Sequence, residues 1–206
     1  MIIVASLGFE EKFILRAIMR RGLKEGDKIV VIMPEGGDTR GERALQVISD
    51  VVLKLSDGTV EVVKHQVNVR DFYGAVSSIR NLLRELSLEG RLVVNLSGGI
   101  RLLIIETLAA VLSLGLQDAE IEIETEDSST VAVIPVRALY PLELELVEKQ
   151  ILQQAAEKGE IRLKDLEGLK LPKATLWRKL ARLTQQGLLE KTNDKYRVSD
   201  LGRMRV

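Results

Sequence analysis

One stretch of the chain, residues 92–101, restricts the fold more than any other. It reads Leu92-Val93-Val94-Asn95-Leu96-Ser97-Gly98-Gly99-Ile100-Arg101, an apolar run that breaks into a polar turn with two glycines. The apolar residues predict a buried parallel strand, and Leu102–Leu114 behind the turn predicts a helix. Ligands of open α/β sheets bind just outside the carboxyl ends of such strands, so the turn is a candidate site for a phosphate-bearing ligand.

The same succession of strand and helix recurs along the first two thirds of the chain. Strands are expected at Ile2–Ser6, Lys28–Met33, Val60–Val67 and Arg91–Asn95, and helices at Glu10–Arg20, Glu42–Leu55, Phe72–Leu86 and Leu102–Leu114, with a loop at 34–41. A β-hairpin over 120–136 follows. This alternation predicts an α/β fold, a Rossmann-like and mostly parallel sheet. The first turn, 6–11, lacks the spaced glycines of a dinucleotide fingerprint, and there is no P-loop lysine.

The pattern changes at Pro141, which disfavours helix in the residue before it and can begin the next one. Three short helices are expected at Leu142–Lys158, Leu163–Leu169 and Lys173–Gln186, followed by a hairpin with its tip at 192–195. Helices and hairpin in this order predict a C-terminal winged helix-turn-helix. We therefore expect two domains, residues 1–138 and 139–206.

Composition and charge exclude some functions and favour one partner. The 206 residues include 30 basic and 30 acidic side chains, yet from Lys170 onward 10 are basic and 3 acidic, a net charge of +7. This asymmetry indicates a polyanionic partner, with a solvated basic face as the alternative. The chain has no cysteine, which excludes disulfides, thiolate zinc sites and a cysteine nucleophile. Without a signal-peptide pattern or a bilayer-spanning apolar run, a cytoplasmic protein with no membrane partner is expected.

The last of the three helices carries the expected DNA-reading surface. Leu176, Leu180 and Leu183 form its apolar stripe, so the opposite arc faces outward. Recognition helices place N-terminal residues on base edges, arginine reads guanine, and lysines suit phosphates. The predicted contacts to double-stranded DNA are Lys173, Ala174, Thr175, Arg178, Lys179, Arg182, Lys195 and Arg197. The lone Trp177 is expected to pack against the hairpin or a neighbouring helix. The alternative for this domain is dimerisation or protein docking.

Two loops are expected to converge into the ligand pocket, 6–9 and 95–101. Each leads into a helix N-terminus, where backbone N–H groups and the helix dipole favour an anion, and Arg101 adds a permanent forked charge. The candidate ligand-binding residues are Ser6, Leu7, Gly8, Phe9, Asn95, Ser97, Gly98, Gly99 and Arg101. The alternative is that the glycines serve only tight turns and that Arg101 pairs with a glutamate.

These two loops, together with the C-terminal helices and hairpin, resemble the CARF-domain transcription regulators of archaeal CRISPR-Cas loci, over nearly the whole chain. The second loop of that family commonly has an aspartate and a methionine where this chain has Asn95 and Ile100. The resemblance implies a homodimer whose loops form one symmetric pocket for a cyclic oligoadenylate, most often cyclic tetra-adenylate. It also implies paired winged helices that read a pseudo-palindrome.

The expected function is therefore that of a CRISPR-associated, ligand-responsive DNA-binding transcription regulator. The alternative is a CARF-type ring nuclease that cleaves the ring without metal, and a third possibility is a metabolite or ordinary nucleotide as ligand. No catalytic residue, metal ligand or resident cofactor is assigned. The single histidine, His65, lies in a strand-like run away from both loops and is expected to be structural. Glu122, Glu124 and Glu126 alternate along one strand, which favours a solvated edge over a metal site.

Overall fold

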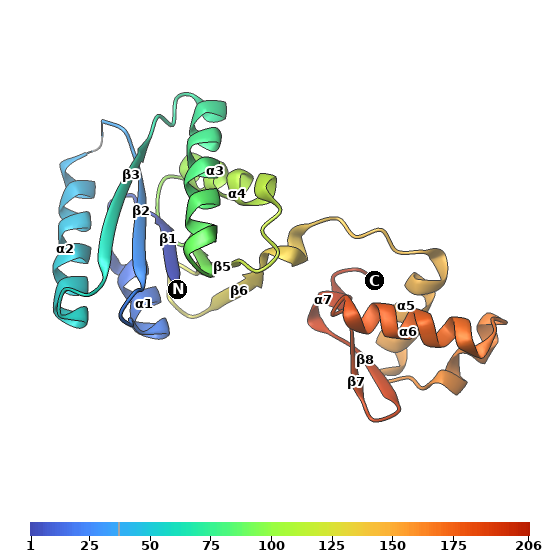
Figure 1. The fold of residues 1–206 in the computed structure, drawn as a ribbon. Helices are drawn as coiled ribbons and strands as arrows, with labels where there is room; N and C mark the ends of the chain where they lie inside the picture. Colours follow the sequence, from blue (N-terminus) through green and yellow to red (C-terminus); the bar gives the residue numbers. More distant parts are fainter. Residues whose placement is uncertain (37) are drawn as a thin grey trace. The chain divides into compact units, whose positions relative to one another are not determined.

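The computed structural model describes residues 1–36 and 38–206; Gly37, in the loop expected at 34–41, lies outside the described residues. The chain divides into two compact units, Met1–Tyr140 and Pro141–Val206. Figure 1 draws the first in blue to yellow and the second in yellow-brown to red. No helix within residues 1–36 and 38–206 is long and apolar enough to cross a membrane.

The N-terminal unit is built around one six-stranded sheet. Its elements are β1 (Ile2–Ser6), α1 (Lys12–Arg21), β2 (Lys28–Pro34), α2 (Thr39–Ser56), β3 (Glu61–Val67), α3 (Phe72–Glu89), β4 (Leu92–Asn95), α4 (Arg101–Leu114), β5 (Glu120–Glu124), β6 (Val131–Pro135) and the 3-10 turn η1 (Val136–Leu139). The strand order is β3-β2-β1-β4-β5-β6, parallel except for the antiparallel pair β5–β6. The predicted Rossmann-like, mostly parallel α/β sheet with a hairpin at one edge is confirmed.

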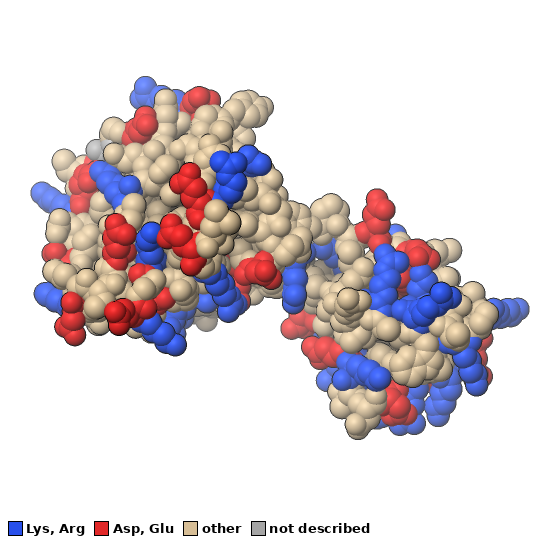
Figure 2. All heavy atoms as spheres, in the orientation of Figure 1, with Lys and Arg blue, Asp and Glu red and all other residues tan. Residues whose placement is uncertain are grey.

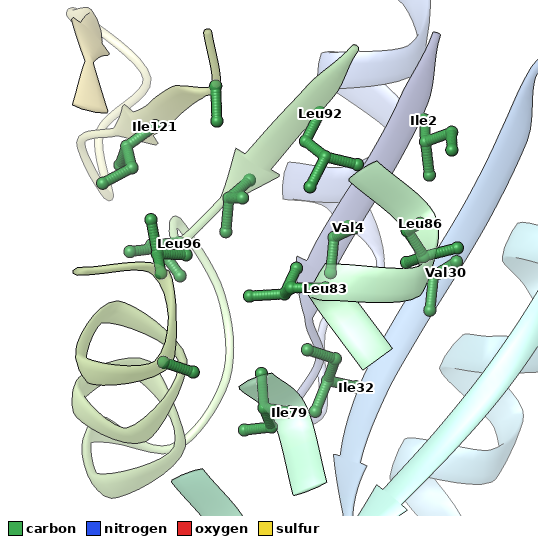
Figure 3. Close-up of a cluster of buried hydrophobic side chains, with 14 of the residues drawn as sticks. Ile2, Val4, Val30, Ile32, Ile79, Leu83, Leu86, Leu92, Leu96 and Ile121 are labelled. Carbon is green, nitrogen blue, oxygen red and sulfur yellow. The ribbon is translucent and has the colours of Figure 1, made fainter. Parts of the chain in front are cut away.

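Helices cover both faces of the sheet because successive side chains of a strand point to opposite sides. Ile2, Val4 and Leu92 point to one side, where they pack with residues of α3 such as Ile79 and Leu83 (Figure 3). Residues of the other parity pack against α1 and α2 in a second buried cluster. Strands that are buried on both faces read as continuous apolar runs, which is why the sequence pattern identifies them.

The loop after β2 is shorter than the sequence predicts. Asp38 caps α2, since its carboxylate accepts a hydrogen bond from the backbone N–H of Arg40, and the helix begins at Thr39 rather than at Glu42. Asp71 caps α3 in the same way by accepting from the N–H of Gly74.

The C-terminal unit consists of short helices and one hairpin around a small core. Its elements are α5 (Leu146–Lys158), the 3-10 segment η2 (Leu163–Leu169), α6 (Lys173–Gln185), β7 (Leu189–Thr192), β8 (Lys195–Val198) and α7 (Asp200–Arg203). The core includes Leu152, Leu166, Leu180 and Tyr196. The first helix begins at Leu146 rather than Leu142, because Glu148 accepts from the N–H of Glu145 and fixes the start there.

Candidate functional site

The carboxyl ends of β1 and β4 lie side by side, because these two strands pair in parallel with Ala5 opposite Asn95. A cavity of about 410 Å³ opens where the two loops leave these strands. It is lined by Gly8, Phe9, Glu10, Lys12, Phe13, Ser97, Gly98, Gly99, Ile100 and Glu126. The structure thus brings together five of the predicted ligand residues: Gly8, Phe9, Ser97, Gly98 and Gly99. The other four predicted residues, Ser6, Leu7, Asn95 and Arg101, do not line it.

Close approach of the two loops requires both the serine and the glycines. The Ser6 hydroxyl is buried and donates to the carbonyl oxygen of Gly98 at 2.5 Å. A Cβ on Gly8 would lie 3.2 Å from the Cα of Gly99, and a Cβ on Gly99 would lie 3.1 Å from the Cβ of Ser6. Gly99 also has φ +104°, a backbone conformation that other residues rarely adopt. Ser6 therefore connects the two loops by a buried hydrogen bond and does not line the cavity.

Asn95 and Leu7 are likewise buried and shape the site from beneath. The Asn95 Oδ1 accepts from the N–H of Ser97 at 3.1 Å, and its Nδ2 donates to Glu122 at 3.3 Å. The Ser97 Oγ accepts from the N–H of Glu124 at 2.9 Å, which ties the loop to β5. The polar turn that follows β4 is therefore held in place by its own side chains.

Both helices that begin at the cavity lack a side-chain cap. Among the described residues, no side chain caps α1 at Glu11 or α4 at Ile100, whereas α2 and α3 are capped by Asp38 and Asp71. The first N–H groups of a helix have no partner within the helix, and the helix dipole makes this end electropositive. The electropositive ends of two helices therefore lie next to the cavity, an arrangement suited to an anion.

Sequence reasoning missed half of the lining. Lys12 forms an ion pair with Glu10 at 2.6 Å, and its ammonium lies 5.0 Å from the centre of the Phe13 ring. Lys12 and Phe13 form the start of α1, directly after the first loop, so extending the candidate site from that loop into the helix start could have found them. Arg101 is exposed as the first residue of α4 and lies outside the lining.

Phe9 lies against the side chain of Arg40, a contact that the sequence did not indicate. The guanidinium of Arg40 lies 4.1 Å from the centre of the Phe9 ring, and both side chains are exposed. Asp38 holds Arg40 in place by accepting from its Nε at 2.9 Å and its Nη2 at 2.7 Å. These hydrogen bonds lower the pKa of Asp38 to about 2. An aromatic face backed by a guanidinium can stack a flat ring.

The expectation of a solvated glutamate edge is wrong for two of the three residues. Glu122 and Glu124 are buried, and only Glu126 is exposed. Arg20 binds Glu122 at 2.6 Å and Glu124 at 2.7 Å, and Arg21 binds Glu122 at 2.8 Å. Burial alone would raise the pKa of Glu122, but the hydrogen bonds from Arg20 and Arg21 outweigh it and the pKa is lowered. The expectation failed because the arginines of α1 cover the face of β5 that carries these two glutamates.

His65 lies on β3, half-buried, with its Nε2 3.0 Å from the hydroxyl of Ser78. Burial lowers the pKa of His65 below its ordinary value. Within residues 1–36 and 38–206, no cluster of His, Cys, Asp or Glu side chains could hold a metal ion.

The predicted DNA contacts of the C-terminal unit fall into two groups. In the first group, Lys173, Ala174, Arg178 and Arg197 are exposed and Thr175 is half-buried. Figure 2 shows Lys and Arg gathered on the visible face of this unit.

The second group is engaged within the unit. Lys179 pairs with Glu145 and also lies 3.3 Å from the buried Glu148, and the exposed Arg182 lies 3.3 Å from the same two carboxylates. Lys195 pairs with Glu160 at 2.5 Å. A DNA contact by any of these cations has to compete with an internal ion pair.

Comparisons with solved structures give two similarities of fold. The fold resembles protein VC1899 of Vibrio cholerae (TM-score 0.49, 15% identity, 98% of this chain). It also resembles Enterococcus italicus Csm6 bound to cyclic hexa-2'-fluoro-hexa-dAMP (TM-score 0.51, 10% identity, 90% of this chain). The chain spans 63% and 50% of the length of these two proteins. A search of curated sequences finds no match.

The sequence itself gives the sharper assignment. Residues 1–135 match the model of the family described as the Csa3 CRISPR-associated Rossmann-like domain. The match covers β1 to β6 and therefore both loops around the cavity. The chain thus belongs to the family of CRISPR-associated Csa3 Rossmann-like, or CARF, domain proteins.

Proposed function

We propose that the N-terminal unit binds a cyclic oligoadenylate in the cavity between the two loops. One observation carries the proposal: within the described part of the chain, no side chain caps either helix that begins at this cavity, in a fold of the CARF family. A ring of phosphodiesters supplies the anions for the electropositive ends of these helices, and its adenines supply flat rings for the Phe9–Arg40 pair. The Csm6 structure, which shares the fold, is bound to a cyclic hexanucleotide analogue.

Two copies of the chain would complete the site. The cavity of about 410 Å³ has the size that holds one drug-sized molecule, so a ring of four nucleotides needs more than one such cavity. Leu102 and Ile105 lie three residues apart on α4 and are 43% and 53% exposed. They offer an apolar face next to the cavity that a second copy would cover. The proposed pocket is therefore shared across a two-fold axis of a homodimer.

The C-terminal unit is proposed as a winged helix that binds double-stranded DNA. Its helix α6 presents Ala174, Arg178 and Arg182 on its exposed face, and the hairpin β7–β8 follows directly as a wing. This arrangement supports a recognition helix in the major groove with arginines that reach guanine. A ligand that binds between two copies would then alter the spacing of the two recognition helices, and the protein would act as a ligand-responsive transcription regulator.

Thermal unfolding in the presence of each candidate ligand tests the sensor. Cyclic tetra-adenylate is expected to raise the melting temperature, whereas linear tetra-adenylate at the same concentration raises it less. Product analysis in the same samples distinguishes the second candidate, because accumulation of linear product would identify a ring nuclease. Equal stabilisation by both forms, or by neither, would contradict the proposal.

Binding of operator DNA tests the second unit. The promoter region upstream of the protein's own reading frame is the first probe. Arg178→Ala is expected to reduce sequence preference, because an arginine on a guanine contributes about 1–3 kcal/mol of discrimination. The matched control is Arg84→Ala, an exposed arginine on α3 of the other unit. Unchanged preference in the Arg178 variant would contradict its role on base edges.

A further inference from the structure

A second cavity, of about 400 Å³, lies within the C-terminal unit between η2, α6 and the hairpin. Trp177, the only tryptophan of the chain, lies in its wall and is 48% exposed. The Lys191 ammonium lies 4.9 Å from the centre of the Trp177 ring and 5.8 Å from that of Tyr196. Trp177 thus contacts Lys191 of the hairpin and leaves about half of its surface accessible to a partner.

The charges of the wall favour an anion. Arg162 pairs with Asp194 at 3.3 Å, and these two charges offset each other. The remaining charged residues of the wall are Lys164, Lys173, Lys191 and Glu167. The three lysines come from η2, α6 and β7, so three separate elements direct positive charge to one small cavity.

The position of Trp177 on α6 indicates which kind of anion the second cavity would bind. Trp177 lies next to Ala174, at the edge of the face of α6 proposed to enter the major groove. In duplex DNA the bases are stacked inside, so an aromatic side chain beside the groove meets the sugar, and the lysines next to it meet the phosphates. The indole offers an apolar wall for a deoxyribose and an N–H donor for a phosphate oxygen.

We propose that this cavity holds the sugar–phosphate backbone of one DNA strand, with Lys173 and Lys191 on phosphates and Trp177 against the sugar between them. The inference rests on the proposed binding of duplex DNA by this unit. It assigns DNA contacts to Trp177, Lys164 and Lys191. These three residues lie outside the face of α6 that presents Arg178 and Arg182. Residues of η2, α6 and the hairpin would thereby all contact the sugar–phosphate backbone of the same DNA strand.

Tryptophan emission gives a direct readout, because Trp177 is the sole source in the chain. The full-length protein is titrated with an unlabelled mixed-sequence duplex while emission is followed, and with a labelled copy of the same duplex while anisotropy is followed. The two midpoints are expected to coincide. Lys173→Gln and Lys191→Gln are each expected to flatten the slope of log K against log salt by about 0.9, one lost phosphate contact each. The control is Lys54→Gln, an exposed lysine of α2, which leaves the slope unchanged.

Each result separates this inference from the proposed function. Anisotropy that reports binding while emission and both slopes stay unchanged overturns the backbone site and leaves DNA binding intact. No binding of any duplex overturns both. A change in emission with adenosine monophosphate alone, at concentrations like those of the duplex, would identify a mononucleotide site and also overturn the inference.

Discussion

The amide of Asn95 donates to the carboxylate of Glu122, with 3.3 Å between Nδ2 and Oε1, in the buried base of the candidate ligand cavity. Glu122 in turn binds Arg20 and Arg21 of α1. This contact gives a physical reason for an amide at position 95, because a carboxylate there would have no proton to donate and would repel Glu122. The loop after β4 is thereby linked through two side chains, Asn95 and Glu122, to the arginines of α1.

Asn95→Asp tests this link. The introduced carboxylate places a second negative charge beside a buried one, so the variant is expected to be less stable at neutral pH by about 1–3 kcal/mol. The loss is expected to shrink in mild acid, because two close carboxylates raise the pKa of one of them and a shared proton restores the hydrogen bond. Urea unfolding at neutral and at mildly acidic pH measures both effects. A loss of stability that does not change with pH would contradict the account.

The ion pairs of Glu122 predict an acid limb, that is, a fall in the free energy of unfolding as the pH drops below neutral. Because the pKa of Glu122 is lower in the folded protein than in the unfolded chain, the folded state binds this proton less readily. Its stabilisation is complete above the unfolded pKa and is lost as the pH falls through the folded one. In Glu122→Gln the loss between neutral and acidic pH is expected to be smaller than in the wild type. Parallel profiles in urea unfolding would exclude Glu122 as a source of the acid limb.

Gly99→Ala tests the close approach of the two loops. The methyl group would require a strained backbone, at about 1–3 kcal/mol, and would also press on Ser6, 3.1 Å away. Gly115→Ala, at the other end of α4, is the matched control, since its φ of +70° is also positive but no atom lies within 4 Å of the added Cβ. We expect both variants to lose stability and only Gly99→Ala to lose ligand stabilisation. Equal ligand binding by both variants would show that the loop contact is dispensable.

Glu145→Gln tests whether internal ion pairs restrain the DNA-binding face. Glu145 is exposed and pairs with both Lys179 and Arg182. The neutral side chain removes a competitor for these cations, so the variant is expected to bind duplex DNA more tightly and with a steeper salt dependence. Anisotropy titrations at several salt concentrations measure this. Weaker binding would instead mean that Glu145 holds the two cations in the orientation that DNA needs.

The sequence predicted the sheet well because strands buried on both faces leave uninterrupted apolar runs, as in Lys28–Met33 and Leu92–Val94. It also indicated which two loops meet. It could not predict that Ser6 and Asn95 lie beneath the cavity, because a polar side chain at the end of a strand can point either way. The Glu122 and Glu124 ion pairs were missed for a related reason: alternating charges look solvated until a helix with arginines is known to cover them. Contacts between distant segments, such as Arg40 on Phe9, leave no local pattern.

Calorimetric titration with cyclic tetra-adenylate measures both the affinity of the ring and the number of chains that bind it, with linear tetra-adenylate and cyclic hexa-adenylate as comparisons. A pocket shared by two copies requires tight binding at one ring per two chains, and we expect this binding to be lost in Gly99→Ala and kept in Gly115→Ala. No heat with any ring, or one ring per single chain with equal affinity in both variants, would contradict a shared pocket at the two loops.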